Sequence, residues 1–148
     1  MNLMPSSNMI QYGSPILLAD AKLVVAAAEQ EALANDLAVI IAVVDSAAQL
    51  VLLQRLDHAQ FGSVAVAIAK AETAVRFKRP TKAFEDALSQ GGVNLRLLTL
   101  SGITAIDGGI PLLREGKLVG AIGVSGMLPH QDAQVALAGV NAYHNAPA

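Results

Sequence analysis

The chain has 148 residues, a length that suits one domain with a core of its own. Its 10 basic and 12 acidic residues leave a formal net charge of −2. That balance excludes the strongly basic surface of a domain that binds nucleic acid or anionic lipid. The sequence contains no cysteine, which excludes disulfides, thiolate catalysis and cysteine-ligated zinc or iron–sulfur centres.

Hydrophobic residues make up 53% of the chain and charged residues only 15%, whereas charged residues are about a quarter of a typical soluble domain. A surface with so few charges favours a homo-oligomer, in which subunit contacts cover apolar area. The first fifteen residues lack the pattern of a signal peptide, and the longest apolar run, residues 37–44, is too short to cross a bilayer. We therefore expect a cytoplasmic protein that binds no membrane.

In chain order, the polar residues 1–14 predict a flexible N-terminal arm, and residues 15–148 a single domain. A helix is expected over residues 16–34. The apolar, β-branched run at 37–44 predicts a buried strand, and residues 50–56 return as the second strand of a hairpin.

A second long helix, residues 61–77, is apolar nearly all round, which predicts burial against the sheet on one side and a second subunit on the other. Pro80 ends this region, and Thr81 is expected to cap a short helix over residues 82–89. Residues 103–106 are a short strand candidate.

The last third predicts strands 109–114 and 117–124, joined by a tight turn at Glu115-Gly116, and then a helix from Pro129 to about Tyr143. Local hairpins separated by helices are typical of an antiparallel sheet in an α+β domain.

Lys70 and Thr73 share one face of the second predicted helix, and a lysine among so many alanines either reaches solvent or is paired in a pocket. Ser125-Gly126 precedes the last helix, where free backbone N–H groups could hold a carboxylate or phosphate. Asp132 in the first turn of that helix would also favour the helix dipole, which is a purely structural role.

The segment Asp107-Gly108-Gly109-Ile110-Pro111 is a flexible step into a strand, compatible with a close ligand or with a plain bulge. The hairpin would bring this segment and Ser125-Gly126 to the end opposite the Glu115-Gly116 turn. We therefore expect both loops to converge on one pocket, with Asp107 and Asp132 near its mouth. Gly109→Val would then weaken ligand binding, unless it acts through folding alone.

The histidines His58, His130 and His144 show no spacing typical of a metal site, and surface or turn positions explain each of them. One histidine is nevertheless enough for axial ligation of haem. No serine lies in a G-x-S-x-G motif, so a hydrolase triad is not indicated.

A set of short motifs occurs in a fixed order: Ile41-Ala42-Val43-Val44-Asp45, Arg55-Leu56-Asp57, Lys70-Ala71-Glu72-Thr73-Ala74, Arg79-Pro80-Thr81, Gly108-Gly109-Ile110-Pro111, Gly120-Ala121-Ile122-Gly123-Val124-Ser125-Gly126 and Gln131-Asp132. In this order the chain resembles the GlcG/HbpS family, which includes the C-terminal domain of PduO-type proteins. The resemblance implies a profilin-like fold, with an antiparallel five-stranded sheet and helices on both faces, and homo-oligomers. Some family members bind haem, one branch is linked to corrinoid metabolism, and others are encoded near catabolic genes.

The sequence departs from the family pattern in several places. Ala48 stands where a glycine is usual in the first hairpin turn, His58 replaces a small or acidic residue, and Met127 replaces a further glycine. His58 and Met127 are therefore candidate haem contacts, alongside His130.

Two functions stay open. The first is an oligomeric protein that binds a small ligand, with haem or a related tetrapyrrole as the preferred ligand. The second is an enzyme or accessory factor of a catabolic pathway that acts on a carboxylated metabolite through Lys70, Asp132 and the two glycine loops. An apolar pocket with room for a porphyrin would favour the first function, and a small polar pocket holding Lys70 and an acid would favour the second. A purely structural partner protein would leave these loops packed.

Overall fold

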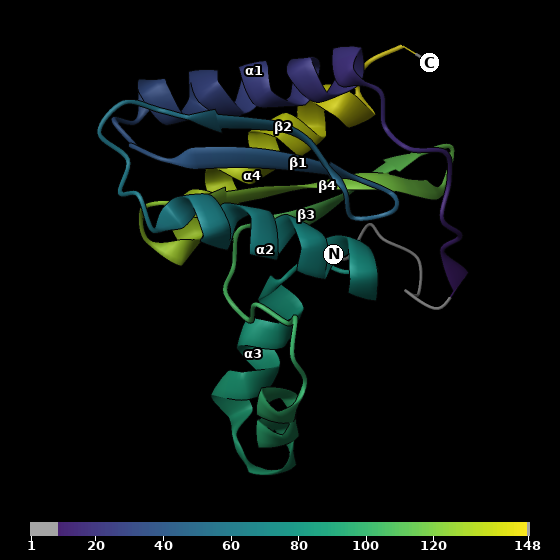
Figure 1. Cartoon of the computed structure of the whole chain (residues 1–148), viewed down its shortest axis with the longest axis vertical. Helices are drawn as coiled ribbons and strands as arrows, with labels where there is room; N and C mark the ends of the chain where they lie inside the picture. The colour runs from purple at the N-terminus through teal and green to yellow at the C-terminus, as the bar shows by residue number, and fades with distance from the viewer. Residues whose placement is uncertain (1–8, 148) are drawn as a thin grey trace.

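The computed structural model describes residues 9–147, which form an antiparallel sheet with helices on both faces (Figure 1). Within this described part the sheet has four strands in the order β2-β1-β4-β3. The strands are β1 (Ile40–Asp45), β2 (Leu50–Arg55), β3 (Gly109–Arg114) and β4 (Lys117–Ser125). The helices are α1 (Leu18–Ala34), α2 (Ser63–Phe77), α3 (Lys82–Gln90) and α4 (Pro129–His144), with a 3₁₀ segment η2 (Gly92–Thr99) after α3. The α+β class is confirmed.

The expected fifth strand is wrong. Residues 103–106 form an irregular loop, because the Thr73 hydroxyl on α2 holds it in place of a strand partner. The backbone N–H of Thr104 donates to Thr73 Oγ1 at 3.0 Å, and Thr73 Oγ1 lies 3.3 Å from the carbonyl of Gly102.

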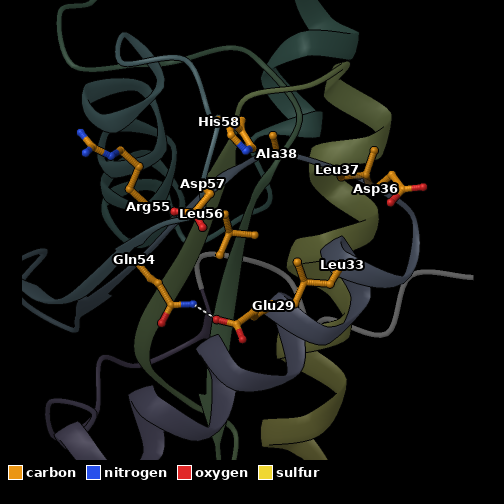
Figure 2. Close-up of a pocket in the computed structure, with 10 residues that line it drawn as sticks. All are labelled: Glu29, Leu33, Asp36, Leu37, Ala38, Gln54, Arg55, Leu56, Asp57 and His58. Atoms are coloured by element: carbon orange, nitrogen blue, oxygen red, sulfur yellow. Dashed lines mark hydrogen bonds between the residues drawn. The ribbon is translucent and has the colours of Figure 1, made fainter.

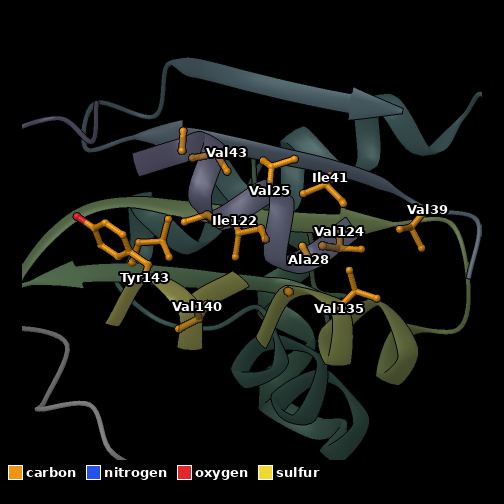
Figure 3. Close-up of a cluster of buried hydrophobic side chains, with 14 of the residues drawn as sticks. Val25, Ala28, Val39, Ile41, Val43, Ile122, Val124, Val135, Val140 and Tyr143 are labelled. Carbon is orange, nitrogen blue, oxygen red and sulfur yellow. The ribbon is translucent and has the colours of Figure 1, made fainter. Parts of the chain in front are cut away.

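Helices α1 and α4 lie together on one face of the sheet, and α2 covers the other face (Figure 1). The larger core lies between α1, α4 and the sheet, and Figure 3 shows Ile41, Val43 and Ile122 of the central strands pointing into it. Helices α3 and η2 project away from the sheet beyond α2. One side of α2 is therefore committed to the sheet, as its apolar pattern predicted.

The approach of α2 to β4 is close because glycine faces it. A Cβ on Gly123 would collide with the backbone of Ala67 and with Ala71 on α2. The small residues on both elements thus let the helix backbone rest against the strand, which explains why α2 is so rich in alanine.

The predicted arm over residues 1–14 lies partly outside the described residues, and from residue 9 the chain is anchored rather than flexible. Ile10 is buried, and Tyr12 pairs with Leu118 beside the end of the sheet. The Tyr12 hydroxyl donates to the carbonyl of Val75 at 2.8 Å, and Lys78 Nζ donates to the carbonyl of Ile10 at 2.6 Å.

The turn at Glu115-Gly116 follows its sequence signal, whereas Ala48 and Thr81 depart from theirs. Glu115 and Gly116 have φ of 54° and 77°, as a two-residue hairpin turn requires. Ala48 keeps a left-handed φ of 61° without the usual glycine, a conformation that costs about 1–2 kcal/mol. Thr81 does not cap α3, because its hydroxyl instead accepts the N–H of Gly109 at 2.9 Å.

Candidate functional site

Lys70 lies in the middle of α2 and is only 1% exposed. Its Nζ donates to the carbonyl of Val124 at 2.8 Å and to Asp132 Oδ2 at 3.1 Å. Asp132 belongs to the first turn of α4 and is itself buried, and its Oδ1 accepts the N–H of Met127 at 3.0 Å. One ion pair therefore ties α2 to the end of β4 and to the start of α4, across two layers of the fold.

Burial and the neighbouring hydrogen-bond donors shift the pKa of Asp132 in opposite directions. Burial raises the pKa of Asp132 above its ordinary value, while Lys70 and the backbone N–H groups of Met127 and Gly126 act to lower it. The charged form of the Asp132 carboxylate is therefore stabilised by one cation and two backbone N–H groups, because the residue is only 2% exposed to solvent.

Beside the ion pair lies a pocket of about 430 Å³, which we call the Lys70 pocket. It is lined by Gln60, Gly62, Ser63, Val66, Lys70, Ile106, Ser125, Met127, Pro129 and Asp132. It therefore holds three residues predicted from the sequence, Lys70, Ser125 and Asp132.

Met127, a candidate haem contact from the sequence, also lines this pocket and not the one around His58. The sequence did not point to the pocket's other walls, although one signal was present. Ser63, Val66 and Lys70 are spaced i, i+3 and i+7, which places them on one face of a helix. Met127 and Pro129 come from the loop that joins β4 to α4, and Ile106 from the irregular loop before β3. These three residues line the pocket only because segments far apart in the sequence pack together.

The two glycine loops do lie at the same end of the sheet. The N–H of Val124 donates to the carbonyl of Gly108 at 2.9 Å, and Gly109 pairs with Gly123 in the register of β3 and β4. However, a Cβ on Gly109 would meet the backbone carbonyl of Lys70 and the methyl group of Thr81. The expectation that Gly109 leaves space for a ligand is wrong, because that space is filled by α2.

The other predicted residues around this end have protein partners. Thr73 Oγ1 donates to the carbonyl of Ala69 at 2.8 Å, Pro111 is buried within β3, and Gly126 has a φ of 145° against the backbone of residue 38. The N–H of Asp107 donates to Glu85 Oε1 at 3.0 Å. Burial, and secondly the nearby Glu85 carboxylate, raises the pKa of Asp107. None of these four residues is among those that line the Lys70 pocket.

A second pocket, of about 590 Å³, lies where the end of α1 meets the end of β2, and we call it the His58 pocket (Figure 2). It is lined by Glu29, Leu33, Asp36, Leu37, Ala38, Gln54, Arg55, Leu56, Asp57 and His58. The amide of Gln54 donates to Glu29 across one side of it. The pocket thus combines leucine side chains, one imidazole, one guanidinium and several carboxylates.

His58 sits in the turn that follows β2. The N–H of Leu56 donates to the carbonyl of Val39 at 3.1 Å, and the N–H of Ala59 donates to that of Leu56 at 3.2 Å. His58 itself has a φ of 71°, in the left-handed region that histidine tolerates better than most residues.

The other histidines lie elsewhere. His130 is exposed on the first turn of α4 and lines neither pocket. His144 Nε2 accepts the N–H of Leu113 at 3.1 Å. Burial, followed by the nearby Arg114, lowers the pKa of His144. In the part of the chain that the structure describes, no three histidine, aspartate or glutamate side chains are grouped to hold a metal ion.

Comparison with known proteins places this chain in a family. The family model described as "Haem degrading protein HbpS-like" matches residues 16–141. The chain is 36% identical to protein GlcG of Escherichia coli over 105 residues, which cover 71% of this chain and 77% of GlcG. The chain therefore belongs to the GlcG/HbpS family, as its ordered motifs predicted.

Two solved structures share the fold. The crystal structure of Klebsiella pneumoniae protein ORFY matches with a TM-score of 0.86 at 30% identity, over 99% of this chain and 100% of ORFY. The crystal structure of PduOC in complex with haem matches with a TM-score of 0.78 at 27% identity, over 86% of this chain and 94% of PduOC. Among residues 9–147, no helix has the length and apolar character needed to cross a bilayer.

Proposed function

We propose that this protein binds haem, or a related tetrapyrrole, in the His58 pocket. The family description and the haem complex of PduOC support the ligand. The observation that carries the site is His58, an imidazole held at a pocket of about 590 Å³, which lies within the usual size range of cofactor sites.

The residues of the His58 pocket suit a porphyrin. Leu33 and Leu56 offer apolar surface to the macrocycle. The Arg55 guanidinium, which lies 5.2 Å from the centre of the Phe61 ring, offers a planar pair of donors to a propionate. The His58 imidazole would hold the haem iron, and the haem would supply redox and ligand-binding chemistry.

A hemin titration tests this proposal. Wild-type protein should give a saturable shift of the Soret band, and His58→Asn should lose it. Asparagine also tolerates the left-handed backbone at this position, so the variant removes the imidazole while sparing the turn. His130→Asn is the matched control and should titrate like wild type. Retained binding in His58→Asn would overturn the site, and a wild-type shift no larger than that of an unrelated protein would overturn haem binding.

A second candidate function is supported by the Lys70 pocket. It would be that of an enzyme or accessory factor of a catabolic pathway, acting on a carboxylated metabolite. The supporting observation is a lysine that is 1% exposed at the polar base of a pocket and paired with an acid. Buried ionisable groups in clefts are typical of functional sites, although structural ion pairs share this property.

Homo-oligomer formation is part of the same proposal. The 3₁₀ segment η2 buries none of its residues, although it carries several large apolar side chains. Val93, Leu95, Leu98 and Leu100 in and after η2 are each more than half exposed. Exposed apolar side chains gathered on one short segment favour a partner, and a second copy of this chain would also cover the outer flank of α2.

A further inference from the structure

The base of the Lys70 pocket is polar and almost entirely shielded from solvent. Ser63, Lys70, Ser125 and Asp132 are 1%, 1%, 6% and 2% exposed. They come from α2, from the last residue of β4 and from the first turn of α4, so three separate elements bring polar groups to one place. Burying polar groups is unfavourable unless each finds a hydrogen-bond partner.

The hydrogen bonds of these groups are complete except at three donors. Asp132 is satisfied by Lys70 and by backbone N–H groups. Ser63 Oγ accepts the amide of Gln60 at 2.9 Å, but its own O–H has no acceptor among the described residues. Ser125 is 6% exposed as a residue and lines the pocket, and its hydroxyl has no hydrogen-bond partner among the described residues. Lys70 Nζ has two acceptors, whereas an ammonium group carries three N–H donors.

Three buried donors at the base of the pocket are open: the O–H groups of Ser63 and Ser125 and the third N–H of Lys70. A complementary ligand therefore presents acceptor oxygens. The pocket also lies at the N-terminus of α4, a helix of 16 residues whose dipole favours an anion there. Hydrogen bonds from an ammonium group to a carboxylate are among the stronger ones in proteins.

The rest of the pocket is apolar. Val66, Ile106, Met127 and Pro129 form its walls around the polar base. This combination fits a ligand with one anionic end and a short hydrocarbon end, because the open donors of the buried residues all lie at the polar base.

We infer that the Lys70 pocket binds a small monocarboxylic acid, with the carboxylate on Ser125 Oγ and Lys70 Nζ and the hydrocarbon chain against Val66, Ile106 and Met127. The inference deepens the second candidate function by naming its ligand class, and it is independent of the haem site. Asp132 acts here as a positioning residue, because it holds the Lys70 ammonium group at the base of the pocket.

Butyrate and butylamine are matched probes of this site, because they share a chain length and differ in the sign of their charge. Titration of ¹⁵N-labelled full-length protein with butyrate should give saturable shifts of the Ser125, Gly126 and Met127 amide signals. Butylamine should not. Ser125→Ala should weaken butyrate binding about tenfold, the usual effect of losing a hydrogen bond to a charged group.

Two further variants separate ligand contact from folding. Ser101→Ala removes a hydroxyl from an exposed loop outside the pocket and should bind butyrate like wild type. Val66→Trp should fill the pocket from its α2 wall and abolish the shifts in a folded protein. Absent shifts in wild type, equal shifts with butylamine, or unchanged affinity in Ser125→Ala would each overturn the inference. A hemin titration of the same sample reports independently on the His58 pocket, so failure of one site is distinguishable from failure of the other.

Discussion

Lys70 and Asp132 are separated by 62 positions in the sequence, yet their side chains meet at 3.1 Å with almost no exposure to solvent. The pair joins the helix on one face of the sheet to a helix on the other face, past the end of β4. A buried charge is tolerated only while its partner is present, so the stability of the fold depends strongly on both members of the pair.

Removing one partner should therefore be costly. We expect Lys70→Met to lower the free energy of unfolding by about 3–5 kcal/mol, because the Asp132 carboxylate would stay buried without its cation. Urea denaturation followed by circular dichroism measures the change. The double variant Lys70→Met/Asp132→Leu should recover part of the loss.

The matched control for this prediction is Lys82→Met. Lys82 pairs with Glu85 and Asp86 at 3.0 and 3.1 Å, but on the exposed side of α3. Solvent screens such pairs, so this variant should unfold close to the wild-type midpoint. If Lys70→Met were no less stable than Lys82→Met, the buried pair would not contribute as we describe.

The glycines of β3 and β4 give a second prediction. Gly123→Ala should destabilise the protein by about 1–3 kcal/mol or more, since the added methyl group must displace α2 from the sheet. Gly62→Ala is the control, because a Cβ there meets no atom within 4 Å and its φ is −59°. Thermal unfolding of the two variants compares them directly, and equal melting temperatures would count against close helix–strand contact.

Gly109→Val should behave like Gly123→Ala. Its side chain would press on the backbone of Lys70, so we now expect lost stability rather than lost affinity in a folded protein.

Local signals in the sequence predicted most elements of the fold. The turn at Glu115-Gly116 and the strands beside it follow from spacing, because a two-residue turn with positive φ fixes the pairing of its neighbours. The helix over residues 61–77 was also predicted within two residues of its observed start. The conformation of such features is determined by residues close to them in the sequence.

Long-range partners decided the features that were predicted wrongly. Thr81 has the pattern of a helix cap, but its hydroxyl bonds to Gly109, which is 28 residues further along the chain. Residues 103–106 are held by Thr73 and so do not extend the sheet. Competition between a local partner and a distant one cannot be read from spacing.

The same reasoning applies to the candidate sites. Lys70 and Asp132 were both identifiable as unusual residues, whereas their pairing depends on two layers meeting beyond the sheet. His58 was identifiable as a candidate haem contact, but the pocket around it was not predicted, because its walls come from the end of α1 and from the turn after β2.

His144 predicts a pH dependence of stability. Its pKa is lowered from 6.5 by burial and by Arg114, so in the window below pH 6.5 the unfolded chain binds a proton that the folded chain does not. Stability should therefore rise with pH between the lowered pKa of the folded protein and 6.5, and be lost as the pH falls through that window. A protonated imidazole also cannot accept the N–H of Leu113.

The test compares wild type with His144→Phe in urea unfolding at about pH 5 to 8. The difference between the two curves should grow in favour of wild type as the pH rises toward 6.5 and then level off. A difference that shrinks with rising pH would contradict the assigned direction of the pKa shift.

The exposed apolar side chains of η2 predict how the protein assembles. Leu98 is 72% exposed and Val93 69%, on a segment that projects from the body of the molecule (Figure 1). Large apolar side chains that are not buried within their own subunit favour burial against another subunit. Sedimentation velocity at micromolar concentration should show a dimer or larger, and Leu98→Glu should shift the protein toward monomer.

Leu23→Glu provides the matched control for this surface. Leu23 is 41% exposed on α1, on the opposite face of the sheet from α2, so a charge there should leave the assembly unchanged. Because η2 buries none of its residues within the subunit, Leu98→Glu should also keep the wild-type melting temperature of the folded subunit. Assembly lost in Leu23→Glu and kept in Leu98→Glu would move the interface to the α1 face, and a wild-type monomer would rule out the oligomer.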